Sequence, residues 1–138
     1  MELAIFESEI QIRPDDIDMN NHVHNAKYLD YVQAARYMQM RDNYKYPMEL
    51  YIEQGYNWFA SEAHISFKRA LKFGDCAIVR TQIKEWKGAQ VSVNFWIFSK
   101  ISNKLAAEGY LVYTLVSLNS GKPVRIPQEI IDKHLIYK

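Results

Sequence analysis

The spacing of apolar and polar residues predicts one short strand, one long helix and then four long strands. Residues 7–13 alternate, with Ile10 and Ile12 on one side, and Pro14 ends the pattern because proline donates no hydrogen bond to a sheet. Further strands are predicted over residues 58–71, 77–86, 91–99 and 106–118, with turns at 74–75, 87–88 and 102–104. Since tight turns join antiparallel neighbours, consecutive strands of this group are expected to pair as a curved sheet.

The segment from Asn25 to about Asn43 is predicted as a helix because it contains no glycine or proline and is rich in helix-favouring residues. Placed at about 100° per residue, its apolar side chains cover most of the circumference, and the best polar sector is narrow: Lys27, Asp30 and Arg41. Such a helix is buried, so the later strands must wrap it. Short helices are predicted over residues 47–54 and 128–135. The sequence therefore predicts an α+β domain over residues 1–138, with a long central helix against a curved antiparallel sheet of about five strands.

Arg36 falls on the apolar side of the predicted helix, between Leu29 and Val32. A lone buried guanidinium is very costly. We therefore expect Arg36 to lie against an acidic partner or at a subunit interface.

Composition narrows the class of protein. The chain has 138 residues, of which 49% are hydrophobic, and its 17 basic and 16 acidic residues nearly cancel. This balance excludes a disordered chain and argues against a general nucleic-acid binder. The single cysteine, Cys76, cannot form an internal disulfide, and the acidic N-terminal residues do not resemble a secretory signal. The longest mostly apolar run, residues 111–118, is far short of the ~20 residues that span a bilayer. We expect a cytoplasmic protein.

The densest group of polar side chains directly precedes the long helix. Residues 15–25 hold three carboxylates, three amides and two imidazoles. The first turn of a helix has unpaired N–H groups and partial positive charge, so a carboxylate held there lies beside an oxyanion site, as acyl transfer requires. Two other interpretations remain open. These side chains could serve only as caps and turns, or Asp16, Asp18, His22 and His24 could bind a metal, although no further ligand is tied to them by spacing.

Residues 16–28 read Asp-x-Asp, then His-Val-x-Asn-x-x-Tyr from His22 to Tyr28. This pattern resembles the signature of hotdog-fold thioesterases. The likeness is to two branches of that family: the 4-hydroxybenzoyl-CoA thioesterase-like enzymes and the thioesterases that act on acyl-acyl carrier protein. Residues 63–75 and 121–127 resemble later segments of the same family. The likeness covers nearly the whole chain, and the predicted order of elements fits that fold independently.

The resemblance implies a role for each matching residue. Asp18 matches the catalytic carboxylate, as nucleophile or as base for water, and Asn25 matches the residue whose backbone N–H polarises the thioester carbonyl. Asn20 and His22 match site residues of the acyl carrier protein branch, and Tyr28 matches a packing residue beside the pocket. That branch also has a Glu-Cys pair on a later strand. This chain has no such pair, so a carboxylate mechanism is favoured over a cysteine nucleophile.

Three basic residues, Lys68, Arg69 and Lys72, cluster before the turn at residues 74–75. They form either a solvated face or a clamp for the phosphates of coenzyme A. Because Lys68 and Arg69 are predicted on a strand, only one of them is expected to line a given groove.

The resulting functional prediction is an acyl thioester hydrolase that acts on acyl-CoA or acyl carrier protein thioesters, without a metal or other cofactor. The alternatives are a hotdog dehydratase or hydratase and a non-catalytic acyl-CoA-binding module. Long sheet edges and the apolar helix predict a homodimer or homotetramer.

Overall fold

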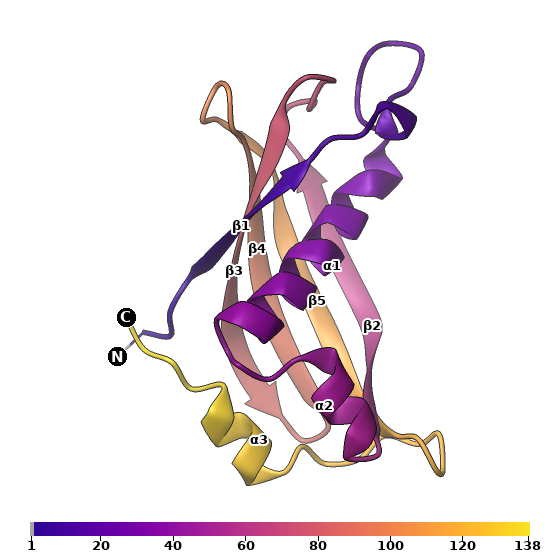
Figure 1. The fold of residues 1–138 in the computed structure, drawn as a ribbon, viewed down its shortest axis with the longest axis vertical. Coiled ribbons are helices and arrows are strands. Elements are labelled where there is room, and N and C mark those ends of the chain that lie inside the picture. The colour runs from indigo at the N-terminus through magenta and orange to yellow at the C-terminus, as the bar shows by residue number, and fades with distance from the viewer. Residues whose placement is uncertain (1) are drawn as a thin grey trace.

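The computed structural model describes residues 2–138, which form one antiparallel sheet with helices on one face (Figure 1). The elements are β1 (Phe6–Gln11), η1 (Pro14–Asp16), α1 (Asn25–Asp42), α2 (Met48–Glu53), β2 (Tyr56–Phe67), β3 (Cys76–Lys87), β4 (Gln90–Ser99), β5 (Leu105–Ser117) and α3 (Gln128–Lys133). The α+β class and the predicted order of elements are confirmed.

The strand order is β1-β3-β4-β5-β2. The expectation that all consecutive late strands pair is therefore wrong for β2, which pairs with β5 instead of β3. The cause is the segment between them. Leu71 leaves the sheet and is only 1% exposed, and its carbonyl oxygen accepts the Val23 N–H at 2.9 Å. The chain thus crosses over the N-terminal end of α1 before it returns as β3.

The sheet curves around α1, and irregular pairing helps it to bend. The register shifts between Ala60 and Glu62 in β2, between Ile83 and Glu85 in β3, and between Ile97 and Phe98 in β4. Such bulges bend a strand and increase its local twist. Gly109 in β5 adds a close approach, because a Cβ there would lie 1.9 Å from the His64 carbonyl oxygen of β2.

Helix α1 lies across the sheet (Figure 1) and buries one face against it. Its buried residues are Tyr28, Tyr31, Val32, Ala35, Arg36, Gln39 and Met40. The opposite side is open: Gln33, Ala34 and Tyr37 are exposed. The predicted polar sector is exposed at Asp30 and Arg41, but the free face is wider than predicted, because tyrosine and alanine tolerate an exposed site.

One buried polar side chain fixes α1 against two strands. Gln39 has no exposed surface, and its amide nitrogen donates to the Ser8 hydroxyl of β1 at 3.1 Å. The Thr81 hydroxyl of β3 donates to the Gln39 amide oxygen. Because a buried amide needs all of these partners, they define the position of α1 along the sheet.

Most predicted element ends lie within two residues of the observed ones, but β2 ends at Phe67, four residues before the predicted end. Lys68 and Arg69 both donate their backbone N–H groups to the carbonyl oxygen of Ala106, at 2.7 and 3.1 Å. Two donors on one acceptor break the strand pattern, so the prediction that these two side chains alternate between faces is wrong. None of the helices within residues 2–138 has the length and apolar character needed to cross a membrane.

Candidate active site

The loop between β1 and α1 is organised by Asp16, whose side chain is buried. The Tyr31 hydroxyl of α1 donates to Asp16 Oδ2 at 2.7 Å, and the Arg13 backbone N–H donates to the same oxygen at 3.0 Å. Burial pushes the pKa of the Asp16 carboxyl upward, but these hydrogen bonds and the Lys27 charge outweigh it, so the pKa lies below the usual value. Asp16 is therefore a charged, paired anchor with a structural role.

Beyond Asp16 the chain forms a tight reversal. The backbone N–H of Asp18 donates to the His22 carbonyl oxygen at 2.8 Å, and Ile17 forms an antiparallel bridge with Val23. Asn21 lies at the turn with φ of 61°, a left-handed conformation that asparagine tolerates better than most residues. The reversal holds residues 18–22 at the surface in a fixed shape.

Within this reversal, only one oxygen of Asp18 is occupied. Oδ1 accepts the backbone N–H groups of Asn20 and His22 at 2.9 and 3.0 Å. The His22 N–H contributes most to holding the Asp18 pKa below its usual range. No group in residues 2–138 donates a hydrogen bond to Oδ2. The carboxylate is thus ionised at neutral pH and keeps a free oxygen for water or substrate.

Helix α1 begins beside this carboxylate and has no side-chain cap. Its N-cap residue is His24, whose side chain makes no capping hydrogen bond. In the described part of the chain, no acceptor meets the backbone N–H groups of Asn25 and Ala26. The first turn of this 18-residue helix therefore has free donors and partial positive charge, which suits a developing oxyanion.

A surface cleft of about 490 Å³ brings these groups together. It is lined by Asp18, His22, Val23, His24, Asn25, Tyr28, Phe67, Lys68, Arg69 and Ala70. Six residues singled out from the sequence thus share one cleft: Asp18, His22, Asn25, Tyr28, Lys68 and Arg69. Together they place a carboxylate, helix N–H donors and two cations around one space.

Two residues singled out from the sequence do not line the cleft. Asn20 is exposed, and its contribution is the backbone N–H donated to Asp18. Lys72 forms a backbone bridge with His22, which holds the reversal against the crossover segment. Tyr28 lines the cleft but is 2% exposed, and its hydroxyl accepts the Leu71 N–H at 2.9 Å, so it also fixes that segment.

Sequence reasoning missed Phe67 and Ala70 as cleft residues, and it named His24 only as a possible metal ligand. Phe67 is 43% exposed, and its ring meets the ring of Tyr28 edge-on at 5.1 Å between centroids. An apolar residue at the end of a strand, beside basic residues, was the available signal. Nowhere in residues 2–138 do three or more histidine, cysteine, aspartate or glutamate side chains gather closely enough to hold a metal ion.

Comparison with known proteins places this geometry in context. Residues 12–133 match the model of the Thioesterase-like superfamily. The chain is 27% identical over 131 residues to the acyl-CoA thioesterase YbgC of Haemophilus influenzae, covering 91% of this chain and 90% of that protein. It is 28% identical over 130 residues to the acyl-acyl carrier protein thioesterase ATL3 of Arabidopsis thaliana, covering 92% and 66%. A DHNA-CoA thioesterase structure from Staphylococcus aureus has the same fold, with a TM-score of 0.85, 17% identity and coverage of 94% and 86%.

The first prediction concerns the Asp16 anchor. Tyr31→Phe removes one hydrogen bond to a buried carboxylate and should lower the free energy of unfolding by about 1.5–3 kcal/mol at neutral pH, measured by urea denaturation. Because the folded-state pKa of Asp16 is depressed, this contribution is present above the ordinary aspartate value of about 3.9 and is lost as the pH falls below it.

Tyr37→Phe is the matched control, because its hydroxyl also donates to a carboxylate, Glu49, but is exposed on the same helix. It should change the free energy of unfolding by no more than about 0.5 kcal/mol. Equal losses in the two variants would show that Asp16 is not the anchor.

Proposed function

The chain belongs to the Thioesterase-like superfamily, and we propose that it hydrolyses acyl thioesters at the cleft beside the start of α1. One observation carries the proposal: an ionised carboxylate with a free oxygen, Asp18, shares a cleft with the unpaired N–H groups of the helix start. The two relatives are named for coenzyme A and acyl carrier protein thioesters, so both carriers are candidate substrates.

The reaction divides between these two groups. Asp18 Oδ2 takes a proton from a water molecule, and the resulting hydroxide attacks the thioester carbonyl carbon. The Asn25 N–H stabilises the oxyanion that forms. When the carbon–sulfur bond breaks, Asp18 returns the proton to the thiolate, which yields a carboxylic acid and a thiol. Alternatively, Oδ2 attacks the carbonyl carbon directly and forms an anhydride that water hydrolyses.

In this proposal, His22 and Asn20 position the Asp18 carboxylate through their backbone groups. Their backbone N–H groups keep Oδ1 occupied, which leaves Oδ2 as the reacting oxygen. The His22 side chain also lines the cleft and is available to orient water or substrate.

The structure offers less support for the alternatives. A hydratase or dehydratase needs an acid or base within the middle of α1, but its acidic residues are Asp30 and Asp42, both exposed. A non-catalytic acyl-CoA-binding module would not need the free Asp18 oxygen. Release of thiol from acyl-CoA esters separates hydrolysis from binding without turnover.

The second prediction tests Asp18. Asp18→Asn keeps an acceptor for the two backbone N–H groups but removes the base, so kcat for acyl-CoA hydrolysis should fall by about a hundredfold or more while the fold is retained. Asp15→Asn, at an exposed position in the same loop, should keep near wild-type kcat. Asp16→Asn should lose less activity than Asp18→Asn and more stability. Near wild-type turnover by Asp18→Asn would refute its role.

The third prediction tests whether the basic side chains bind the thiol carrier. Lys68→Ala should raise KM for acyl-CoA several-fold at nearly constant kcat, because a phosphate contact is equally strong in the ground and transition states. The effect should weaken as salt rises, since exposed charges are screened over about 10 Å at 0.1 M.

Arg69→Ala should act in the same direction, although the Arg69 guanidinium also donates to the Leu105 carbonyl oxygen at 3.2 Å. Lys72→Ala should have a smaller effect, since Lys72 does not line the cleft. Lys84→Ala, exposed on β3, is the control. A small thioester without phosphates should show no change in any variant. An unchanged KM in Lys68→Ala and Arg69→Ala at low salt would show that these side chains only face solvent and do not bind the phosphates.

We also propose that residues 1–138 act as one hotdog domain in a homodimer joined through β2. The two sheet edges differ. On β1, Glu7 pairs with Arg80 and Glu9 with Lys100, so charge protects that edge. On β2, residues 59–64 are all exposed, and Phe59 is 62% exposed. The open β2 edge is the better candidate for pairing with a second copy.

The fourth prediction follows from this difference. Light scattering should give a mass of at least twice the 16.3 kDa of one chain. Ala63→Lys should shift the protein toward monomer, because it places a charge in the middle of the β2 edge, whereas Glu7→Ala on the β1 edge should not. A wild-type mass of about 16 kDa at working concentration would exclude the dimer.

A further inference from the structure

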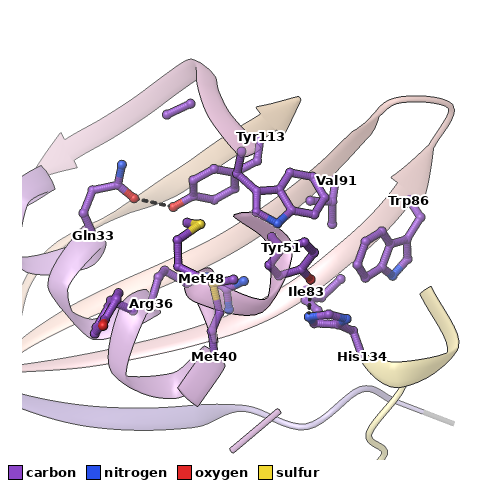
Figure 2. Close-up of a pocket in the computed structure, with 13 residues that line it drawn as sticks. Gln33, Arg36, Met40, Met48, Tyr51, Ile83, Trp86, Val91, Tyr113 and His134 are labelled. Atoms are coloured by element: carbon purple, nitrogen blue, oxygen red, sulfur yellow. Dashed lines mark hydrogen bonds between the residues drawn. The ribbon is translucent and has the colours of Figure 1, made fainter. Parts of the chain in front are cut away.

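A second cavity lies between α1, α2 and the sheet, about three turns along α1 from the cleft. It has a volume of about 210 Å³ and is partly open to solvent. Figure 2 shows its wall, which is mostly apolar and aromatic and includes Met40, Met48, Tyr51, Ile83, Trp86 and Tyr113. It shares no lining residue with the cleft that holds Asp18. An apolar space of this kind favours an apolar molecule over water.

Arg36 is the exception in this wall. Its side chain extends from α1 among the apolar residues that line the cavity (Figure 2) and is 7% exposed. Its Nε and Nη1 atoms are buried and meet no hydrogen-bond acceptor within residues 2–138. The expected acidic partner is absent from the described residues, because none of the ion pairs found there includes Arg36.

The groups around Arg36 give it an aromatic contact but no negative charge: its guanidinium carbon lies 5.6 Å from the centroid of the Tyr44 ring. Tyr44, Tyr51 and Tyr113 have pKa values raised by burial, so they are neutral at pH 7. Burial lowers the pKa of His134 to about 4, so this ring is neutral as well, and it pairs with the Tyr51 hydroxyl at 2.9 Å. The Tyr113 hydroxyl donates to the Gln33 side chain at 2.6 Å. Arg36 is thus the single charge that faces this cavity in the described chain.

A buried guanidinium without a counter-charge is unfavourable, and a carboxylate is its best partner because two N–H groups match two oxygens. We propose that this cavity is a binding site for an apolar molecule that carries a carboxylate, with its oxygens on Arg36 and its apolar body against the aromatic wall. The volume sets the size. A cavity of about 150 Å³ accepts a benzene ring, so 210 Å³ suits one ring or a short chain, not a long fatty acid.

Two sources share this chemistry. One is a free carboxylic acid, which binds here independently of catalysis. The other is the far end of an acyl thioester that bears a second carboxylate, and this source alone rests on the proposed function. Arg36 lies eleven residues after Asn25, about 16 Å along α1 at 1.5 Å per residue. Such an acyl group would therefore need a long chain, of which only the carboxylate end would occupy the cavity.

The binding experiment uses hexanoate and its neutral counterpart 1-hexanol as probes, with calorimetric titration and thermal denaturation of the full chain. Wild-type protein should bind hexanoate about tenfold or more tightly than 1-hexanol, because only hexanoate pairs with the guanidinium. Arg36→Met should lose this preference. Its own Tm without ligand should stay equal or rise, since an unpaired buried charge has been removed. Arg41→Met is the control, because Arg41 lies exposed on the same helix and pairs with Asp42.

A second arm identifies the source. Hydrolysis of an acyl-CoA whose acyl group ends in a carboxylate is compared with hydrolysis of the methyl-ended ester of equal length. A lower KM for the first ester, lost in Arg36→Met, assigns the site to the acyl group. Equal KM values together with hexanoate binding assign it to a free acid. Inactivity on every ester would refute only the proposed function, because the binding arm needs no turnover.

Equal binding of hexanoate and 1-hexanol by the wild type would overturn the proposal, and this comparison stands even if Arg36→Met fails to fold. Full retention of the hexanoate preference in Arg36→Met would overturn it too. A third contrary result is dissociation of a dimer by Arg36→Met without any hexanoate preference in the wild type, which would show that a second copy of the chain supplies the counter-charge.

Discussion

Asp16 carries the one buried carboxylate found in residues 2–138, and the geometry of the candidate active site depends on it. Burying a charge is costly unless hydrogen bonds replace the lost water. Those bonds come from Tyr31 on α1 and from the backbone before the loop, while the Asp16 carbonyl oxygen accepts the His24 N–H at 2.9 Å. One residue thus ties the end of β1, the reversal at residues 17–23 and the start of α1 together.

This anchor explains why two carboxylates only two residues apart differ in their roles. Both have depressed pKa values, but Asp16 is enclosed and paired, while Asp18 is open to the cleft with Oδ2 free. Position along α1 matters equally. Gln39 holds the helix to β1 and β3, and the Leu71 N–H bond to Tyr28 holds the crossover segment against its first turn. The start of α1 therefore lies beside Asp18 with its first N–H groups unpaired, while the neighbouring buried polar groups have hydrogen-bond partners.

Much of the fold was accessible from sequence because local periodicity and turn chemistry agree with the final structure. The predicted α1 ends within a residue of its observed end, and β3, β4 and β5 lie close to their predicted ranges. The pairing of β2 with β5 was not accessible, because it depends on where Leu71 is buried, which is a long-range packing effect. The same holds for Lys68 and Arg69, whose convergence on the Ala106 carbonyl oxygen has no local signal.

For the site, too, local sequence predicted one part and long-range packing decided the other. The motif from Asp16 to Tyr28 located the cleft, and the structure brings Asp18, His22, Asn25 and Tyr28 together there. Of the two surroundings predicted for Arg36, the acidic partner is absent from residues 2–138, and the subunit interface stays a prediction. The most direct test of the account is a structure with a non-hydrolysable acyl-CoA analogue. We expect the carbonyl oxygen within hydrogen-bond distance of the Asn25 N–H and the carbonyl carbon facing Asp18 Oδ2. A carbonyl bound away from both groups would contradict it.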